Sequence, residues 1–214
     1  AMKALSSDQV LSLTTTQVSN LSTMQFNALD SADVSAMTVD QIQVLSNTVI
    51  GKMDSAHEAA LTSEQVAALT ALQVKALSSD TIGNLGTSQV DALSASQWMS
   101  VSTSAMAALS TAQVAQISTT ELQSLSAAQV KALSADAITS LTTARLASFK
   151  VAQVQAFSTA QVAALSTDQV KGLSKTQVTG LSEANLKALN TAQVAALTTT
   201  QLSGLSDAQA KALT

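Results

Sequence analysis

Residues 157–172 read FSTAQVAALSTDQVKG, which is one eight-residue unit followed at once by another. The same unit recurs from Leu5 to Ala212 without an insertion or deletion, so this span holds 26 whole octapeptides. Its general form is L-[ST]-[ST]-x-Q-[VI]-x-[AG]. Fixed self-similarity at a short period is typical of solenoids, in which each repeat buries its apolar face only against its neighbours. The repeat therefore predicts architecture directly and activity only indirectly.

Positions 1 and 6 of the octapeptide are the predicted core. Position 1 is apolar in every unit, and position 6 is apolar in every unit except one, where Glu58 stands. The smallest residue at position 6 is Ala210. Because 214 residues include only one Trp and three Phe, this core must be built mainly from Leu, Val and Ala.

Positions 2 and 5 encode a helix start in almost every unit. Position 2 is Ser, Thr, Asp or Asn in 24 of 26 units, and position 5 is Gln in 17. This spacing is a capping box, in which the position 2 oxygen accepts from the N3 backbone N–H and Gln accepts from the N-cap N–H. Gly86 and Lys150 lack the cap oxygen, and at Lys150 we expect a loss of about 1 kcal/mol. At position 8, Gly172, Gly180 and Gly204 suit a left-handed helix exit.

Other periodic structures fit the octapeptide less well. In one continuous helix, equivalent leucines would rotate by about 80° per unit and leave no apolar face. In a strand, positions 1 and 6 would point to opposite faces, and Ala and Gln are poor strand formers. The sequence predicts an all-α solenoid with one very short capped helix per octapeptide, and a β-solenoid is the alternative. We expect a single elongated repeat domain over residues 1–214, a fragment of a longer array, with the number of units per superhelical turn left open.

Composition excludes several classes of partner. The net charge is −4, only 11% of residues are charged, and no stripe of Lys or Arg exists, so we expect no nucleic-acid binding. The chain has no cysteine and hence no disulfide or thiolate metal site. No apolar run approaches the roughly 18 residues that a membrane span needs, so we expect no membrane insertion.

The densest polar cluster is Asp54, His57 and Glu58, within one octapeptide. One His with two carboxylates is an incomplete metal-ligand set, so we expect no metal and no cofactor. We interpret the cluster as a degenerate unit whose Glu58 turns outward or is paired, with Lys52 as a candidate partner. One His also cannot activate dozens of equivalent Ser residues, so we expect no catalytic residues and no enzymatic activity.

Large side chains mark two further departures from the repeat. Trp98 and Met99 form one, and Phe149, Lys150 and Val151 form the other. Such side chains at core positions more often fill a gap than line a pocket, so we interpret both as packing.

Threonines at position 3 are the one repeated candidate for a binding surface. They could line up as a flat, weakly polar face, although Ser7, Ala71, Lys175 and Glu183 interrupt the row. Helix-starting turns also favour Ser and Thr for local hydrogen bonding alone. The candidate residues are Thr15, Thr23, Thr87, Thr103, Thr111, Thr119, Thr143, Thr159, Thr167, Thr191 and Thr199.

The repeats that begin at Leu109 and Phe157 resemble low-complexity octapeptide arrays of very large bacterial exported and cell-surface proteins, some of them adhesin-like. The resemblance covers essentially the whole chain and implies an extracellular or cell-surface location with a spacer or adhesive role. It implies no catalytic residue. The first functional hypothesis is a non-enzymatic spacer rod whose partners are neighbouring repeats or domains, with end-to-end self-association at its open ends. The alternative is a Ser/Thr/Gln face that binds a polysaccharide, ice or another rod.

Overall fold

The computed structural model describes residues 2–213, and these residues form 26 α-helices, a short 3-10 helix at Met2–Ala4 and no β-strand. Each octapeptide contributes one α-helix of four to six residues. The predicted all-α solenoid is therefore confirmed, and the β-solenoid alternative is wrong. Among the described residues, no helix has the length and apolar character that crossing a bilayer requires.

The chain divides into two compact units, residues 1–108 and 109–214, and the boundary falls between the thirteenth and fourteenth octapeptides. The helices of the first unit are α1 (Ser7–Leu11), α2 (Thr15–Ser19), α3 (Thr23–Phe26), α4 (Ser31–Ala36), α5 (Val39–Gln43), α6 (Asn47–Ile50), α7 (Ser55–Ala60), α8 (Ser63–Ala67), α9 (Ala71–Ala76), α10 (Ser79–Asn84), α11 (Thr87–Asp91), α12 (Ala95–Trp98) and α13 (Thr103–Ala108).

The second unit repeats the same pattern. Its helices are α14 (Thr111–Val114), α15 (Thr119–Ser124), α16 (Ala127–Ala132), α17 (Ala135–Thr139), α18 (Thr143–Ala147), α19 (Val151–Gln155), α20 (Thr159–Ala164), α21 (Thr167–Gly172), α22 (Lys175–Gly180), α23 (Glu183–Lys187), α24 (Thr191–Ala195), α25 (Thr199–Leu202) and α26 (Asp207–Lys211).

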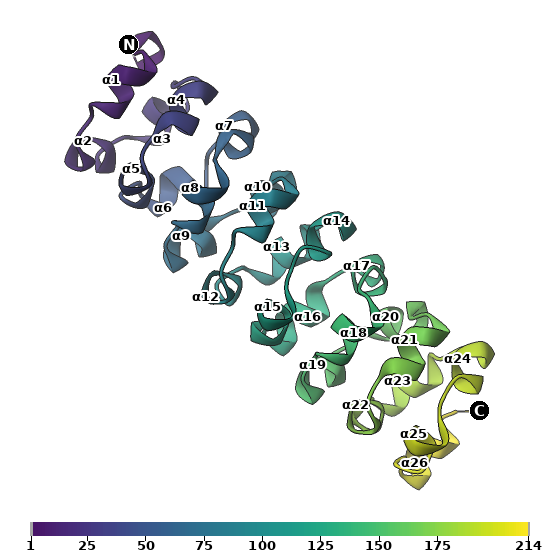
Figure 1. The fold of residues 1–214 in the computed structure, drawn as a ribbon. Coiled ribbons are helices and arrows are strands. Elements are labelled where there is room, and N and C mark those ends of the chain that lie inside the picture. Colours follow the sequence, from purple (N-terminus) through teal and green to yellow (C-terminus); the bar gives the residue numbers. More distant parts are fainter. Residues whose placement is uncertain (1, 214) are drawn as a thin grey trace. The chain divides into compact units, whose positions relative to one another are not determined.

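Three octapeptides make one superhelical turn in each unit. Helix α4 packs against α7, and α7 packs against α10, so helices three apart in sequence form a stack (Figure 1). In the second unit, α17, α20 and α23 form such a stack in the same way. Each unit thus has three parallel stacks, and residues three octapeptides apart occupy equivalent places on successive turns. The sequence left this number open because its octapeptides show no grouping by three.

The capping box forms as the sequence predicts. In α20, the Gln161 backbone N–H donates to Ser158 Oγ at 3.2 Å, and the Ser158 N–H donates to Gln161 Oε1 at 2.8 Å. The chain then leaves the helix at Leu165, whose φ of −56° and ψ of 140° are extended. The position 1 residue therefore ends one helix, and the Ser that follows it begins the next.

The left-handed exit expected at Gly172, Gly180 and Gly204 is wrong. No glycine in residues 2–213 has a positive φ, because the extended position 1 residue makes the turn instead. Two of these glycines make room for neighbouring side chains. A Cβ on Gly180 would lie 3.0 Å from Gln155 Cγ, and one on Gly204 would lie 2.6 Å from Lys175 Cε.

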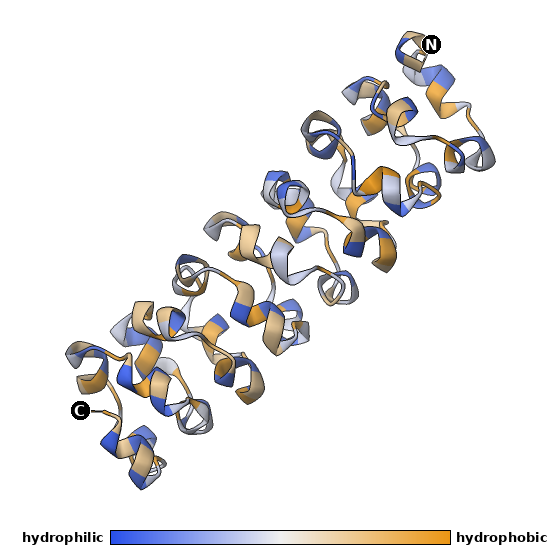
Figure 2. Cartoon of the chain, turned by 180° about the vertical axis from the view of Figure 1, so that it is seen from behind, coloured by the Kyte–Doolittle hydropathy of each residue, from blue (hydrophilic) through white to orange (hydrophobic). Residues whose placement is uncertain are grey.

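The core consists of positions 1 and 6, as predicted, together with position 5. Leu165 and Val162 are 3% and 0% exposed, and Gln161 is only 1% exposed. Figure 2 shows how apolar and polar residues alternate along the short helices of each unit. Isolated helices of this length are unstable in water, so stacking of the turns must hold them.

The buried Gln at position 5 joins successive turns. Gln161 Nε2 donates to the backbone oxygens of Val130 and Leu133 at 3.0 and 2.8 Å, which lie 31 and 28 residues earlier. The same amide caps its own helix through Oε1. One side chain therefore starts a helix and binds that helix to the previous superhelical turn.

Candidate functional site

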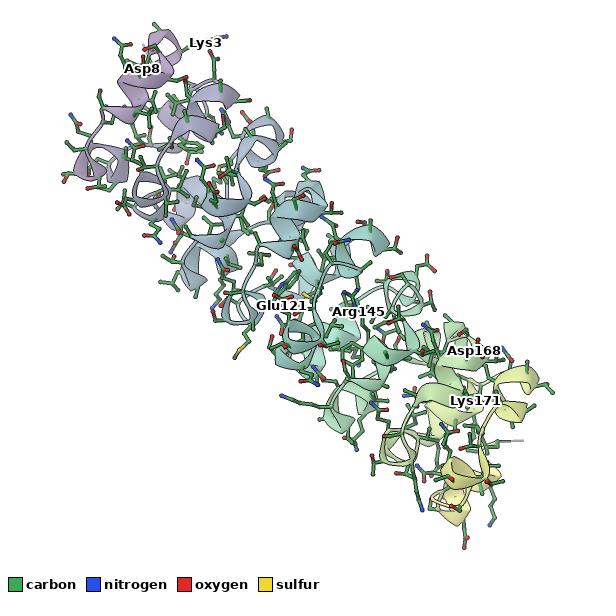
Figure 3. The ribbon with its side chains drawn as sticks, in the orientation of Figure 1. Lys3, Asp8, Glu121, Arg145, Asp168 and Lys171 are labelled. Carbon is green, nitrogen blue, oxygen red and sulfur yellow. The ribbon has the colours of Figure 1, made fainter. Side chains whose placement is uncertain are left out.

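The cross-turn bond of position 5 requires a donor, and several substitutes for Gln supply one. Asn185 Nδ2 donates to the Phe157 oxygen at 2.9 Å, 28 residues earlier. Arg145, marked on α18 in Figure 3, donates through Nη1 to the Ala115 oxygen. These residues are unlike Gln in charge or length, but they keep the same connection between turns.

His57 takes the same structural place as Gln. Its side chain is buried, and Nε2 lies 2.8 Å from the Leu29 oxygen, again 28 residues earlier. Because a carbonyl oxygen only accepts, Nε2 is the donor. Nδ1 lies 2.8 Å from Asp54 Oδ1, and the same oxygen accepts from the His57 backbone N–H at 3.0 Å. The ring also packs against Phe26 with centroids 5.5 Å apart, so His57 is built into the core.

Glu58 does not turn outward, and its partner is not Lys52, so these two parts of the interpretation are wrong. Its side chain is only 4% exposed, whereas Lys52 is exposed. Thr81 Oγ1 donates to Glu58 Oε1 at 2.6 Å, and Asn84 Nδ2 donates to Oε2 at 3.1 Å. Thr81 stands where other units have Gln, and its short side chain leaves room for the carboxylate to reach α10. The partners of Glu58 thus come from the next turn of its own stack.

Asp54, His57 and Glu58 do not converge on a common point. His57 binds the turn before it through Leu29, and Glu58 binds the turn after it through Thr81. No group of three His, Cys, Asp or Glu in the described part of the chain is placed to hold a metal ion. Within residues 2–213, the polar partners of the His57 ring are the Leu29 oxygen and Asp54 Oδ1, and no hydroxyl is hydrogen-bonded to it.

Of the large side chains at irregular points, Trp98 and Phe149 pack in the core as predicted, but Met99 does not, because it is 64% exposed. Trp98 is fully buried, and Phe149 and Phe157 are 3% and 4% exposed. The rings of Phe149 and Phe157 meet edge to face with centroids 5.9 Å apart, a favourable aromatic geometry. At Lys150, half of the capping box remains, because the Lys150 N–H still donates to Gln153 Oε1 at 2.8 Å.

The position 3 threonines are distributed over three stacks rather than along one row. All eight of the most regular ones begin a helix and are exposed: Thr103, Thr111, Thr119, Thr143, Thr159, Thr167, Thr191 and Thr199. Four of them recur at intervals of one superhelical turn, and we name Thr119, Thr143, Thr167 and Thr191 the threonine column. In the second unit, Thr111, Thr159 and Thr199 lie on the other two stacks, and Thr103 belongs to the first unit.

The threonine column presents exposed methyl and hydroxyl groups on consecutive turns. Helices α18 and α21 contact each other, as do α21 and α24. The hydroxyls of the four threonines make no hydrogen bond within residues 2–213 that would occupy them. The four threonines are therefore exposed to solvent.

Two segments of the chain match a known protein family. Residues 146–183 and 178–214 each match the ALTTAQ repeat. The ALTTAQ segments together cover less than half of the chain, and they lie in its most regular part. Within them, residues 188–193 read ALNTAQ and residues 196–201 read ALTTTQ, each one letter from the family description. Among curated proteins, none matches this sequence.

Proposed function

We propose that the chain is a non-enzymatic structural repeat that spaces or presents other domains of a bacterial surface or secreted protein. The match of residues 146–214 to the ALTTAQ repeat supports a structural repeat role. The resemblance to octapeptide arrays of exported proteins supports the location. The absence of cysteine is compatible with passage through an oxidising compartment.

One observation carries this proposal, namely the connection that position 5 makes between turns. Gln193, Gln201 and other members of the series bind backbone oxygens 28 to 31 residues earlier, each in the same way. Each turn therefore needs only its immediate neighbours. Insertion of three octapeptides would add one turn and replace the contacts at the insertion point with equivalent ones, which is the property a spacer of adjustable length requires.

Deletion of one whole turn tests the proposal. Removal of residues 133–156 takes out three octapeptides and restores the repeat phase at the junction. We expect unchanged helicity per residue by circular dichroism and a maximum dimension, from small-angle scattering, shorter by about 8–10 Å. The matched control removes residues 133–152, which breaks the phase and should lower stability. An unchanged dimension, or unfolding by the in-phase deletion, would argue against a spacer.

A second candidate function is polysaccharide binding by the threonine column. Its regular, exposed hydroxyls favour an extended ligand with a matching repeat. Thr143→Lys combined with Thr167→Lys should abolish retention on insoluble polysaccharide, whereas Thr159→Lys, on another stack, should not. Retention of the double variant would reject this face, and adsorption to ice or to other copies instead would reassign it.

We also propose end-to-end self-association for this chain. In its first turn, Gln9, Gln17 and Gln25 use Oε1 for capping, and their Nε2 atoms bind no backbone oxygen within residues 2–213. In its last turn, the backbone oxygens of Leu189, Leu197 and Leu205 receive no amide of this kind from the described residues. The two ends are thus complementary in hydrogen bonding. Analytical ultracentrifugation should show association that weakens when the three glutamines become alanine.

A further inference from the structure

A cavity in the first unit lies where the repeat departs most from its consensus. It has a volume of about 650 Å³ and is bounded by α7, α10 and the end of α13. Its lining residues include Ser55, Glu58, Ser78, Asp80 and Asn84. Hydroxyl, amide and carboxylate groups therefore make up much of the cavity lining.

Glu58 supplies this cavity with a buried carboxylate that lacks a cationic partner. Both of its bonds come from neutral groups, Thr81 Oγ1 and Asn84 Nδ2, and no ion pair forms at Glu58 within residues 2–213. A buried carboxylate is costly unless its charge is paired. Each carboxylate oxygen can accept more than one hydrogen bond, so capacity for a further donor remains at both oxygens.

The repeat architecture itself does not call for a carboxylate at this place. All other octapeptides have an apolar residue at position 6. The two octapeptides that supply most of the cavity lining, residues 53–60 and 77–84, differ from the consensus at further positions. Thr81 replaces the usual Gln, and Asn84 replaces the usual small residue at position 8. Gly83 also lines the cavity and has no side chain to occupy it; a Cβ there would lie 3.5 Å from the Ala108 oxygen. These changes both hold the carboxylate and leave space in front of it.

We propose that this cavity binds an organic cation through a primary ammonium group that pairs with Glu58. A compact ammonium needs one free acceptor position on one carboxylate oxygen, whereas a guanidinium fork needs free, coplanar positions on both oxygens at once, and each oxygen already uses one position for α10. A metal ion is a poorer fit because no third His, Cys, Asp or Glu joins the site in the described residues. This binding function goes beyond the structural role and does not depend on it.

The remaining lining groups suit hydroxyls on the ligand. Ser55, Ser78 and Ser79 can donate and accept, and Asp80 adds a second carboxylate among the lining residues. Amino sugars and aliphatic polyamines both carry the required ammonium, and they differ in whether hydroxyls accompany it. A direct comparison of the two therefore identifies the source.

Calorimetric titration with four probes tests the proposal, in salt that screens general attraction to an acidic chain. The charged probes are glucosamine and putrescine, and the neutral controls are N-acetylglucosamine and 1,4-butanediol. We expect a charged probe to bind and its neutral control not to. Tighter binding of glucosamine would assign an amino sugar, and tighter binding of putrescine a polyamine. Absence of binding by both charged probes would overturn the proposal.

Two substitutions at Glu58 and one elsewhere make the test specific. Glu58→Gln should weaken binding by at least about tenfold while the far-UV spectrum stays unchanged. Glu58→Leu restores the apolar consensus, so it keeps the fold even if the Gln variant does not, and it should also lose binding. Glu64→Gln removes an exposed carboxylate of the neighbouring octapeptide and should bind as the parent does. Equal losses in all three, or no loss in either Glu58 variant, would contradict the assignment.

Discussion

Gln153 Nε2 donates to the Leu125 backbone oxygen at 2.7 Å across 28 residues of sequence. The same amide donates to the Leu122 oxygen, and its Oε1 accepts from the Lys150 N–H. Both oxygens that receive the amide lie one superhelical turn earlier. This one side chain therefore joins local helix formation to the packing of successive turns.

Replacement of a buried position 5 glutamine should be costly. Gln161→Ala leaves the Val130 and Leu133 oxygens without their amide donor, which should lower the free energy of unfolding by about 1–3 kcal/mol. Urea denaturation measures the loss. Gln161→Glu separates the two roles, because a carboxylate can still cap Ser158 but faces two carbonyl oxygens. If the Glu variant were as stable as the parent, the cross-turn bond would contribute nothing.

His57→Gln should be tolerated. Gln is the consensus residue at position 5, and its Nε2 can reach the Leu29 oxygen that His57 Nε2 binds. We expect a stability within about 0.5 kcal/mol of the parent. His57→Ala removes the bond and opens space beside Phe26, and it should cost about 1–3 kcal/mol. Equal stability of the Ala and parent proteins in thermal melts would show that His57 does not take the place of Gln.

Lys150→Ser should stabilise the second unit. The hydroxyl would accept from the Gln153 backbone N–H and complete the capping box that Lys150 leaves half-formed, a gain of about 0.5–2 kcal/mol. The exposed Lys75→Ser change lies inside a helix and serves as a control without a cap to gain. A Lys150→Ser melting temperature at or below that of the parent would refute the expectation.

Leu125→Ala tests how far the stacking is cooperative. Leu125 is 3% exposed, and its loss should cost about 2–5 kcal/mol locally. In a nearest-neighbour array, the defect should let the turns on its two sides unfold separately. Hydrogen exchange would then show different protection before and after residue 125. Loss of all protection in one transition would contradict this picture.

Much of the fold follows from the sequence because four positions have local roles: positions 1 and 6 form the core, and positions 2 and 5 cap the helix. As the octapeptide predicts, Leu165 and Val162 are core residues and Ser158 caps its helix. The number of units per turn could not be predicted, because it depends on how whole turns pack, and single octapeptides carry no signal of it. The sequence does not indicate the second role of Gln161, because helix capping alone accounts for a Gln at this position. The replacements of Gln give only a mixed signal, because a side-chain donor is kept in some octapeptides (His57, Arg145, Asn185) and lost in others (Asp33, Val49, Ala105, Glu121, Ala137).

The candidate sites were predictable only in part. The sequence singled out Glu58, but its partners Thr81 and Asn84 lie 23 and 26 residues away and meet it only through the three-unit turn. The same turn decides which threonines share a face. The packing of three octapeptides per turn therefore determines which residues meet at each candidate site, and a single octapeptide gives no sign of it.

Dipolar coupling between pairs of spin labels tests the three-unit turn most directly, and the absence of native cysteine makes labelling specific. Thr143→Cys with Thr167→Cys places labels on α18 and α21, which pack together with axes about 8–10 Å apart. Thr143→Cys with Thr159→Cys places them only two octapeptides apart but on different stacks. We predict strong broadening for the 143–167 pair and weaker broadening for the 143–159 pair. Stronger coupling in the 143–159 pair would mean two octapeptides per turn and would contradict the three-unit turn.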